Sequence, residues 1–283
     1  MNGPATTAGV GLLSAGSWGG SDFLGGMGAR RAPALLVVAS GHFVSLIILL
    51  IVCLAGRFAL PGRHDVFFSA LGGLEGALAL ALFYRALAMG AMGLTAALTG
   101  LLTALVPVLF SIAHDGLPTP LAAAGLAVGL AAIWLITHAP AAGKEPPATP
   151  PAALLLGALA GLGFGTQLIL FKVAAGGSLL WIMTAARAAG VSAMLLLLVV
   201  MPPKAPWRGF WLYGVLAGAL DTLGNLLYIQ TTRMGRLDVA AIVCSLYPAG
   251  TILLAALVLR EWPSRRQFAG IALALAAVVL LSI

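Results

Sequence analysis

The stretch LPTPLAAAGLAVGLAAI, residues 117–133, recurs late in the chain as WPSRRQFAGIALALAAV, residues 262–278. The shift of 145 residues that relates the two superposes Pro118 on Pro263, Gly125 on Gly270, and Met89-Gly90 on Met234-Gly235. A shift of 146 residues takes Trp18-Gly19 to Phe164-Gly165. Self-similarity at one spacing indicates that the fold is built from two copies of one unit.

The composition around this repeat is that of a membrane protein. Of the 283 residues, 61% are hydrophobic and only 8% are charged, and the mean hydropathy is +1.08. A soluble domain is about 25% charged. Glycine- and proline-rich breakers separate apolar segments of the roughly 20 residues that a membrane-spanning helix needs. We therefore expect an all-α integral membrane protein with ten transmembrane helices, at about 6–24, 33–55, 66–89, 94–113, 119–138, 152–172, 178–201, 209–232, 238–259 and 265–283.

Each copy of the repeat contains five of these helices, which is an odd number. The second copy must then enter the membrane from the side opposite to the first, giving two inverted five-helix repeats. We place the repeats at 1–138 and 152–283, joined by the proline-rich linker APAAGKEPPATPP at 139–151. Inverted repeats of this kind are common in secondary transporters, because they let one central site open to either side in turn.

Charge, cysteine and motif content exclude several other classes. The formal net charge of +7 is scattered over short loops and helix ends, which suits a membrane surface and predicts no nucleic-acid partner. The lone cysteines Cys53 and Cys244 form no metal or disulfide pattern, and the four histidines are too dispersed for a metal set. No hydrolase, zinc-protease or P-loop motif occurs. We expect neither catalysis nor a cofactor.

The first apolar stretch lacks a preceding basic residue, which favours a permanent helix over a signal peptide.

Four motifs then follow one another in a recognisable order. They are SWGGSDF (17–23), GFGTQLILFK (163–172), AARAAG (185–190) and YPAGTILLAALVLREWPSRRQFAG (247–270). In this order the chain resembles EamA-type members of the drug/metabolite transporter superfamily. The resemblance implies a ten-helix carrier of small metabolites, multi-pass in a bacterial inner membrane. The halves also diverge, since the first carries His42 where the second has Arg187, and Pro107 lies about one turn after the position that Pro248 predicts.

A polar stripe marks the eighth helix. Asp221, Asn225, Tyr228 and Thr232 are spaced so that all four lie on one helical face. An ionisable group at mid-bilayer costs about 2.5–3.5 kcal/mol on insertion scales, so it usually faces a partner or a water-filled cavity. We predict that the stripe forms a cavity wall. The alternative is hydrogen bonding between helices, at about 0.6 kcal/mol per contact.

Other polar residues fall at matching depths in the two halves. Glu75 on the third helix lies one position from the counterpart of Asp221, and Arg187 and His42 lie near the middle of their helices. A carboxylate there can accept a proton, hold a cationic cargo group or pair with Arg187. Pairing of Arg187 with either Asp221 or Glu75 is compatible with the sequence.

The first, sixth and ninth helices add further candidates. Trp18, Ser21 and Asp22 lie on the first helix, and Gln167 occupies the aligned place on the sixth. Trp18 suits either a cavity wall, where it would contact a cargo ring or cation, or an interfacial aromatic belt. On the ninth helix Tyr247 precedes Pro248, which predicts a kink that serves as a gate or reflects packing. Glycines four residues apart, such as Gly157, Gly161 and Gly165, predict close helix contacts.

These features predict a secondary transporter that exports small amphipathic metabolites, such as amino acids, by alternating access. The cavity would be lined by helices one, three, six and eight, with contributions from two, seven and nine. Its partners would be a small-molecule substrate, membrane lipid and protons, with Glu75, Asp221 and His42 as proton-coupling candidates. A non-transporting scaffold or accessory subunit is the main alternative, and a lipid-linked-sugar flippase lies between the two. Cargo identity, direction and oligomeric state are open at this point.

Overall fold

The computed structural model describes residues 4–29, 31–88, 92–138, 150–202, 209–259 and 264–281. Within these ranges the secondary structure is helical throughout, and they contain no strand. The helices are α1 (Pro4–Ala29), α2 (Ala34–Ala55), α3 (Arg63–Ala88), α4 (Met92–Asp115), α5 (Pro120–His138), α6 (Pro151–Val173), α7 (Leu179–Val200), α8 (Trp211–Met234), α9 (Leu237–Cys244), α10 (Tyr247–Leu254), the π-helix η1 (Ala255–Leu259) and α11 (Arg265–Leu281).

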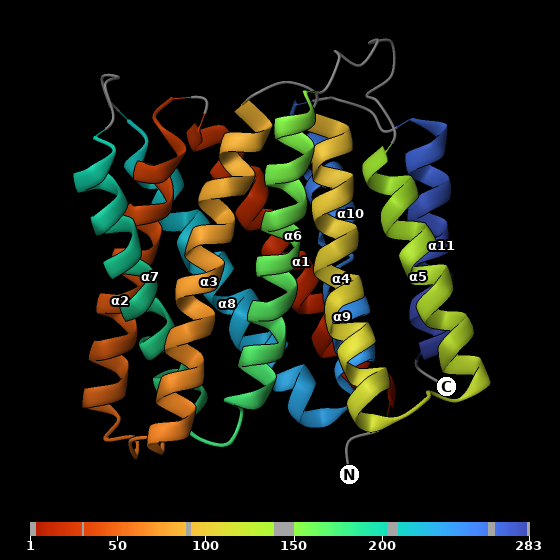
Figure 1. Ribbon diagram of the computed structural model, residues 1–283, viewed down its shortest axis with the longest axis horizontal. Helices are drawn as coiled ribbons and strands as arrows, with labels where there is room; N and C mark the ends of the chain where they lie inside the picture. The colour runs from red at the N-terminus through yellow and green to blue at the C-terminus, as the bar shows by residue number, and fades with distance from the viewer. Residues whose placement is uncertain are drawn as a thin grey trace.

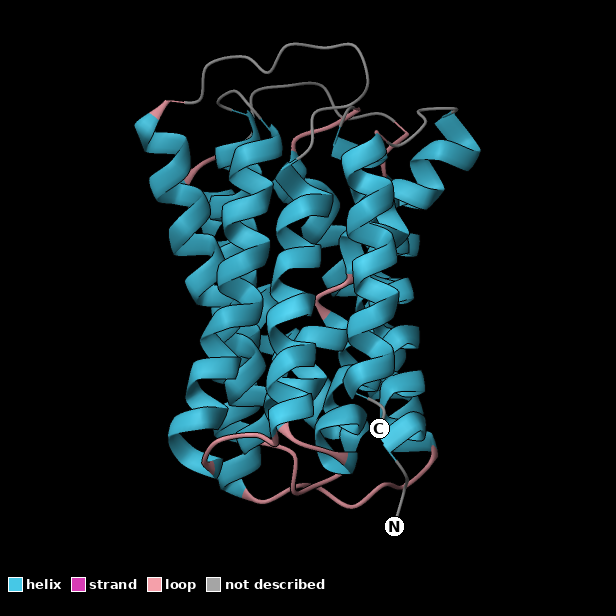
Figure 2. Ribbon diagram, turned by 90° about the vertical axis from the view of Figure 1, so that its right-hand side faces the viewer, coloured by secondary structure: helices cyan, strands magenta, loops and turns pink. Residues whose placement is uncertain are grey.

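The helices run roughly alongside one another from one end of a bundle to the other (Figures 1 and 2). The segments α9, α10 and η1 follow one another along a single crossing, so the described helices cross the bundle ten times. Both chain termini lie at the same end, which we call the terminal end (Figures 1 and 2). Helix α6 starts from the opposite end, whereas α1 starts from the terminal end. The predicted ten-helix fold with an inverted second half is confirmed.

Length and apolar character make this bundle a membrane protein. Seven described segments are long and apolar enough to cross a bilayer, and α5 is apolar but shorter. The outward faces are rich in large apolar side chains, with Val199 79% exposed and Leu257 77% exposed. A bilayer rather than water accounts for such a surface, and helices satisfy their backbone hydrogen bonds within the hydrocarbon.

The two halves of the chain interdigitate. Helix α1 packs mainly on α8, and α3 packs mainly on α6; α2 contacts α7, and α5 contacts α11. The counterpart of α1 in the other half is α6, and the counterpart of α3 is α8, so the α1–α8 and α3–α6 contacts are equivalent. The α2–α7 and α5–α11 contacts each join a helix to its own counterpart. The bundle therefore has a pseudo-two-fold axis between the halves. The boundaries of the two repeats as separate domains stay a prediction.

Glycine allows the closest helix crossings on both sides of this axis. A Cβ added to Gly41 on α2 would lie 2.5 Å from the Gly214 carbonyl oxygen and 2.9 Å from the Gly218 Cα on α8. The equivalent crossing joins Gly73 on α3 to Ala186 on α7, where an added Cβ would overlap the Ala186 backbone. Both contacts agree with the close approach that small residues permit between helices in lipid.

The ninth crossing is broken in its middle. Helix α9 ends at Cys244 and α10 begins at Tyr247, so Ser245 and Leu246 form a turn inside the bundle. Pro248 has no N–H, so the Cys244 carbonyl lacks the donor that would continue the helix, and the proline ring crowds that carbonyl. The sequence predicted a kink within this helix, and the structure contains a complete break one turn before the proline.

Several helix boundaries differ from the predicted ones. Helix α1 covers 4–29 rather than 6–24, and α3 begins at Arg63 rather than near 66. Helix α6 begins at Pro151, the last residue of the predicted linker, because proline suits the first turn of a helix, where its missing N–H is not needed. Linker residues 139–149, and residues 260–263 of the last motif, lie outside the described residues.

Candidate substrate cavity

A cavity of about 100 Å³ lies between the two halves, near the middle of the bundle. Helices from both halves contribute to its wall. The described residues that line it are Trp18, Asp22, His42, Gly73, Gly76, Ala77, Leu80, Phe83, Thr103, Phe164, Gln167, Leu168, Phe171, Met183, Ala186, Arg187, Asp221, Asn225 and Tyr247. Helices α1, α2, α3, α6, α7 and α8 were all predicted to contribute, as was the ninth crossing, whereas Thr103 on α4 was not.

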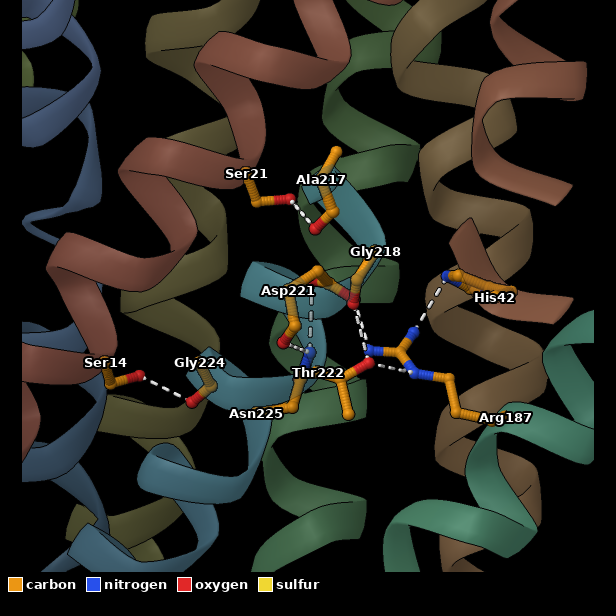
Figure 3. Close-up of polar contacts among 10 residues, drawn as sticks. All are labelled: Ser14, Ser21, His42, Arg187, Ala217, Gly218, Asp221, Thr222, Gly224 and Asn225. Atoms are coloured by element: carbon orange, nitrogen blue, oxygen red, sulfur yellow. Dashed lines mark hydrogen bonds and ion pairs between the residues drawn. The ribbon is translucent and has the colours of Figure 1, made fainter. Parts of the chain in front are cut away.

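Arg187 is the centre of the polar network in this wall (Figure 3). Its Nη2 group donates to Asp221 Oδ2, and its Nε donates to Thr222 Oγ1 at 3.1 Å. Its Nη1 lies 2.8 Å from His42 Nε2. The Arg187 side chain is 6% exposed, whereas the Asp221 side chain keeps 32% exposure toward the cavity. Of the two pairings that the sequence allowed, the structure contains Arg187 with Asp221.

His42 receives its hydrogen bond from Arg187 across the pseudo-two-fold axis. The two residues are counterparts in the repeat, 145 positions apart. Since arginine only donates, His42 Nε2 accepts and the ring is neutral, which places its proton on Nδ1. Nδ1 is buried and has no hydrogen-bond partner among the described residues, and an added Cβ on Gly190 would lie 2.8 Å from it. The two halves carry different residues at this repeated position, so Arg187 can donate a hydrogen bond to His42.

Asn225 holds Asp221 from the next turn of α8. Its Nδ2 donates to the Asp221 backbone carbonyl at 2.7 Å and to Asp221 Oδ1 at 3.1 Å. The Asp221 carboxylate thus receives hydrogen bonds on both oxygens, from Arg187 and from Asn225. An ionised group inside a membrane protein needs such partners to offset its lost hydration.

Trp18 lies deep in the wall rather than at a membrane surface. Its ring centroid is 5.8 Å from that of Tyr228 and 6.2 Å from that of Tyr247, the latter in an edge-to-face arrangement. Gly224 on α8 makes room for it, because an added Cβ would lie 2.5 Å from Trp18 Cδ1. Of the two positions that the sequence allowed for Trp18, the structure contains the one in the cavity wall and not the one in an interfacial aromatic belt.

Asp22 and Gln167 reach the cavity from aligned positions of α1 and α6. Gly76 on α3 leaves space for the Gln167 amide. Asp22 lies one helical turn after Trp18 on the same face of α1. Within the described part of the chain, no hydrogen bond or ion pair involves the Asp22 carboxyl group.

Four other predicted residues are absent from the described wall. Ser21 donates to the Ala217 carbonyl at 2.8 Å and joins α1 to α8 (Figure 3). Tyr228 is completely buried and donates to the Leu168 carbonyl at 2.9 Å, and Thr232 donates to Ile229 of its own helix. The stripe on α8 is longer than the cavity, so its last two residues enter the packed core. Glu75 is partly exposed but does not line the cavity.

Apolar lining residues were not identified from the sequence. Phe83 on α3 and Phe164 on α6 meet edge to face in the wall, with ring centroids 6.2 Å apart. Phe171 and Met183 line the cavity toward the terminal end. In a chain that is 61% hydrophobic, nothing in the sequence separates these residues from core or lipid-facing ones.

Comparisons with known proteins agree with this architecture. The model of the EamA-like transporter family matches residues 151–283. The second half of the chain belongs to the EamA-like transporter family. The predicted resemblance is therefore confirmed on the half that carries three of the four motifs.

A solved structure shares the fold of nearly the whole chain. One protein crystal structure is 20% identical to this chain, covers 97% of it over 96% of its own length, and superposes with a TM-score of 0.77. Among curated proteins, none matches the chain significantly. Members of the EamA-like family are transporters rather than enzymes, and this chain is a multi-pass membrane protein of transporter type.

Proposed function

We propose that the chain is a secondary transporter that moves small amphipathic metabolites, such as amino acids, through the central cavity by alternating access. One observation carries the proposal: a cavity lined by both halves contains a charged network, Arg187 with Asp221, at the middle of a membrane bundle. Intramembrane charges that line a cavity are typical of substrate and ion pathways. We propose the lining residues Trp18, Asp22 and Asn225 as further substrate contacts, and export as the direction.

The pseudo-two-fold axis supports alternating access. Because the α1–α8 and α3–α6 contacts are equivalent, exchanging the conformations of the halves would close one end and open the other at similar energy. At the terminal end, Arg236 binds Asp238 at 2.9 Å and donates to the carbonyl of Gly116 at 2.9 Å. We call these contacts the Arg236 latch. It ties the start of α9 to the end of α4 in the other half.

The packing of the core also supports a bundle that is closed at the terminal end. Between the cavity and the terminal end, α6 to α9 bury a cluster that includes Phe171, Ile182, Tyr228 and Leu237, each less than 2% exposed. Trp181 also donates to the Phe58 carbonyl at 2.9 Å, joining α7 to the loop after α2. This packing fits a state in which cargo has no path to the terminal end.

Protons are the proposed coupling ion, and Asp221 and His42 are the proposed coupling residues. Protonation of His42 would remove the acceptor that Arg187 uses, and protonation of Asp221 would remove the charge that Arg187 matches. Either change would free the guanidinium to rearrange. Transport that is equally fast at all pH values, and unchanged in Asp221→Asn, would exclude this coupling while leaving the carrier function in place.

A scaffold without transport is the second candidate, and a lipid-linked-sugar flippase is a third. A scaffold has no use for a mid-membrane cavity with a partly exposed carboxylate, because burying such a group costs stability. A flippase would need the polar wall to continue to one membrane surface, whereas the Asp221 and Asn225 stripe ends in packed core at Tyr228. These observations favour a carrier of small molecules.

The test uses the purified full-length protein in detergent and in liposomes. Melting temperatures are measured against amino acids, amines, nucleosides and lipid-like phosphates, since a ligand at 100 times its Kd stabilises by about 2.7 kcal/mol. Compounds that stabilise are then followed into liposomes as radiolabelled cargo. We expect one class to stabilise and to be transported, with both effects lost in Asp221→Asn and in Asn225→Ala. If no compound is transported by a correctly folded, reconstituted protein, the scaffold is the better explanation.

A further inference from the structure

We infer that the cargo carries an ammonium group without a matching carboxylate, and that Asp22 binds this group while the aromatic wall of the cavity holds the apolar body. This inference rests on the proposed transport function and narrows its small amphipathic metabolites to cationic amines, which excludes amino acids. It makes Asp22 a specificity-determining residue for charge.

The charges on the cavity wall do not balance. Among the described lining residues, two carry carboxyl groups, Asp22 and Asp221, and one carries a fixed positive charge, Arg187. His42 contributes no charge while it accepts from Arg187. Arg187 is matched by Asp221, so the Asp22 carboxyl group is the one without a counterion. A cation that entered the cavity would supply the charge that the wall lacks.

An amino acid would also bring a carboxylate into the cavity. A cargo carboxylate needs a cationic partner, and Arg187 is the only fixed cation among the described lining residues. All three of its nitrogens already contact protein groups, namely Asp221, Thr222 and His42. The Arg187 charge is already matched by Asp221, so a cargo carboxylate that shared Arg187 with Asp221 would add an unmatched negative charge beside Asp221 and Asp22, which is unfavourable in a low-dielectric site. The wall therefore disfavours anions and zwitterions.

Aromatic side chains line the cavity together with Asp22. Trp18 lies one turn away on α1, and its ring contacts Tyr247 edge to face. Phe83 and Phe164 form a second edge-to-face pair in the same wall. Aromatic faces attract cations, and most strongly where water is excluded. The same rings accept an aliphatic body, so an amphipathic ammonium ion suits the whole wall.

Cavity size limits the body of this cargo. A cavity of about 100 Å³ is somewhat smaller than the roughly 150 Å³ engineered cavity that holds benzene. We therefore choose probes on one small skeleton: 3-methylbutylamine as the cation, 3-methylbutan-1-ol as its uncharged counterpart of equal size, 4-methylpentanoate as the anion, and leucine as the zwitterion.

Binding of these four probes to the full-length protein in detergent is measured from concentration-dependent melting temperatures at pH 7. We expect the amine to bind with a Kd lower than that of the alcohol or the carboxylate by about tenfold, which corresponds to one strong charge contact. In Asp22→Asn, which keeps the side-chain shape, the preference for the amine over the alcohol should disappear. Glu75→Gln is the matched control, because it removes a carboxyl group from the membrane that does not line the cavity, and it should leave the preference intact.

The outcomes separate this inference from the proposed function. Tighter binding of the carboxylate or of leucine than of the amine would overturn the inference, and so would an amine preference that survives in Asp22→Asn. The proposed transporter would still stand in both cases if the preferred compound crosses liposome membranes. If none of the four binds and another compound class is transported, the inference also fails. If no compound of any class is transported, the proposed function itself fails.

Discussion

At the scale of single residues, the central feature is an arginine whose partners come from both halves of the chain. The sequence identified Arg187, His42 and Asp221 as polar residues at similar depth, because ionisable groups stand out against an apolar background. It did not determine which carboxylate pairs with Arg187, since that depends on how α7 and α8 cross. Thr222 was missed, because threonine is common within helices, where its hydroxyl usually bonds to its own backbone.

The first prediction concerns this pair. Arg187→Gln leaves Asp221 without its cation beside Asp22, and we expect the free energy of unfolding in detergent to fall by about 2–4 kcal/mol, somewhat below the range for a fully buried pair because Asp221 stays partly exposed. Adding Asp221→Asn to this variant should recover part of the loss, because it removes the unpaired charge. A double variant no more stable than the single one would contradict the pairing.

The second prediction compares two fully buried serines. Ser14 Oγ donates to the Gly224 carbonyl at 2.8 Å, whereas Ser245 Oγ in the break of the ninth crossing has no partner in the part of the chain that the structure describes. Ser14→Ala should lower the free energy of unfolding by about 1 kcal/mol, because a buried hydrogen bond is lost. Ser245→Ala should be neutral or stabilising, because an unsatisfied hydroxyl is removed. Equal losses in the two variants would show that Ser245 has a stabilising partner.

At the scale of helices, glycine spacing and proline position were informative in the sequence. The glycines four residues apart on α6 predicted close crossings, and Gly161 and Gly165 each lie against backbone atoms of α4. The position of Pro248 predicted a kink, although the full break before it also depends on the neighbouring helices. Helix partners could not be predicted, because apolar residues on lipid-facing and protein-facing sides look alike.

The third prediction uses these crossings. Gly41→Ala places a methyl group against the backbone of α8, which cannot yield without separating the helices, and should cost about 1–3 kcal/mol in the free energy of unfolding. Gly16→Ala on α1 is the control, because a Cβ there would meet nothing within 4 Å. That variant should be neutral or gain up to about 1 kcal/mol from helix propensity. Similar melting temperatures for the two variants would refute the tight crossing.

At the scale of the whole molecule, the inverted repeat was the decisive signal in the sequence. A recurrence at 145 residues and an odd number of helices per copy were sufficient to predict opposite orientations of the halves. The interdigitated pairing of α1 with α8 and of α3 with α6 could not be predicted, because the repeat fixes symmetry but not which surfaces meet. The cavity depends on that pairing, so its apolar residues emerged only from the structure.

The fourth prediction tests the closed terminal end. Hydrogen bonding to Asp238 raises the pKa of Arg236 above its usual range, so Arg236 stays charged at physiological pH. Arg236→Gln should weaken the closed state, and backbone amides at the end of α4 and the start of α9 should exchange with deuterium several-fold faster. Arg57→Gln, an exposed arginine at the same end, is the control. Unchanged exchange in Arg236→Gln would mean that the latch does not hold this end closed.

The most direct test of alternating access needs no knowledge of the cargo. Leu80→Cys places a thiol in the cavity wall, in a background where Cys53 and Cys244 are replaced by alanine, and a membrane-impermeant maleimide is applied to vesicles of each orientation. Leu78→Cys, on the same helix but facing lipid, is the control. We predict that Leu80→Cys reacts from both sides of the membrane and that Leu78→Cys reacts from neither. Reaction of Leu80→Cys from one side only would contradict alternating access.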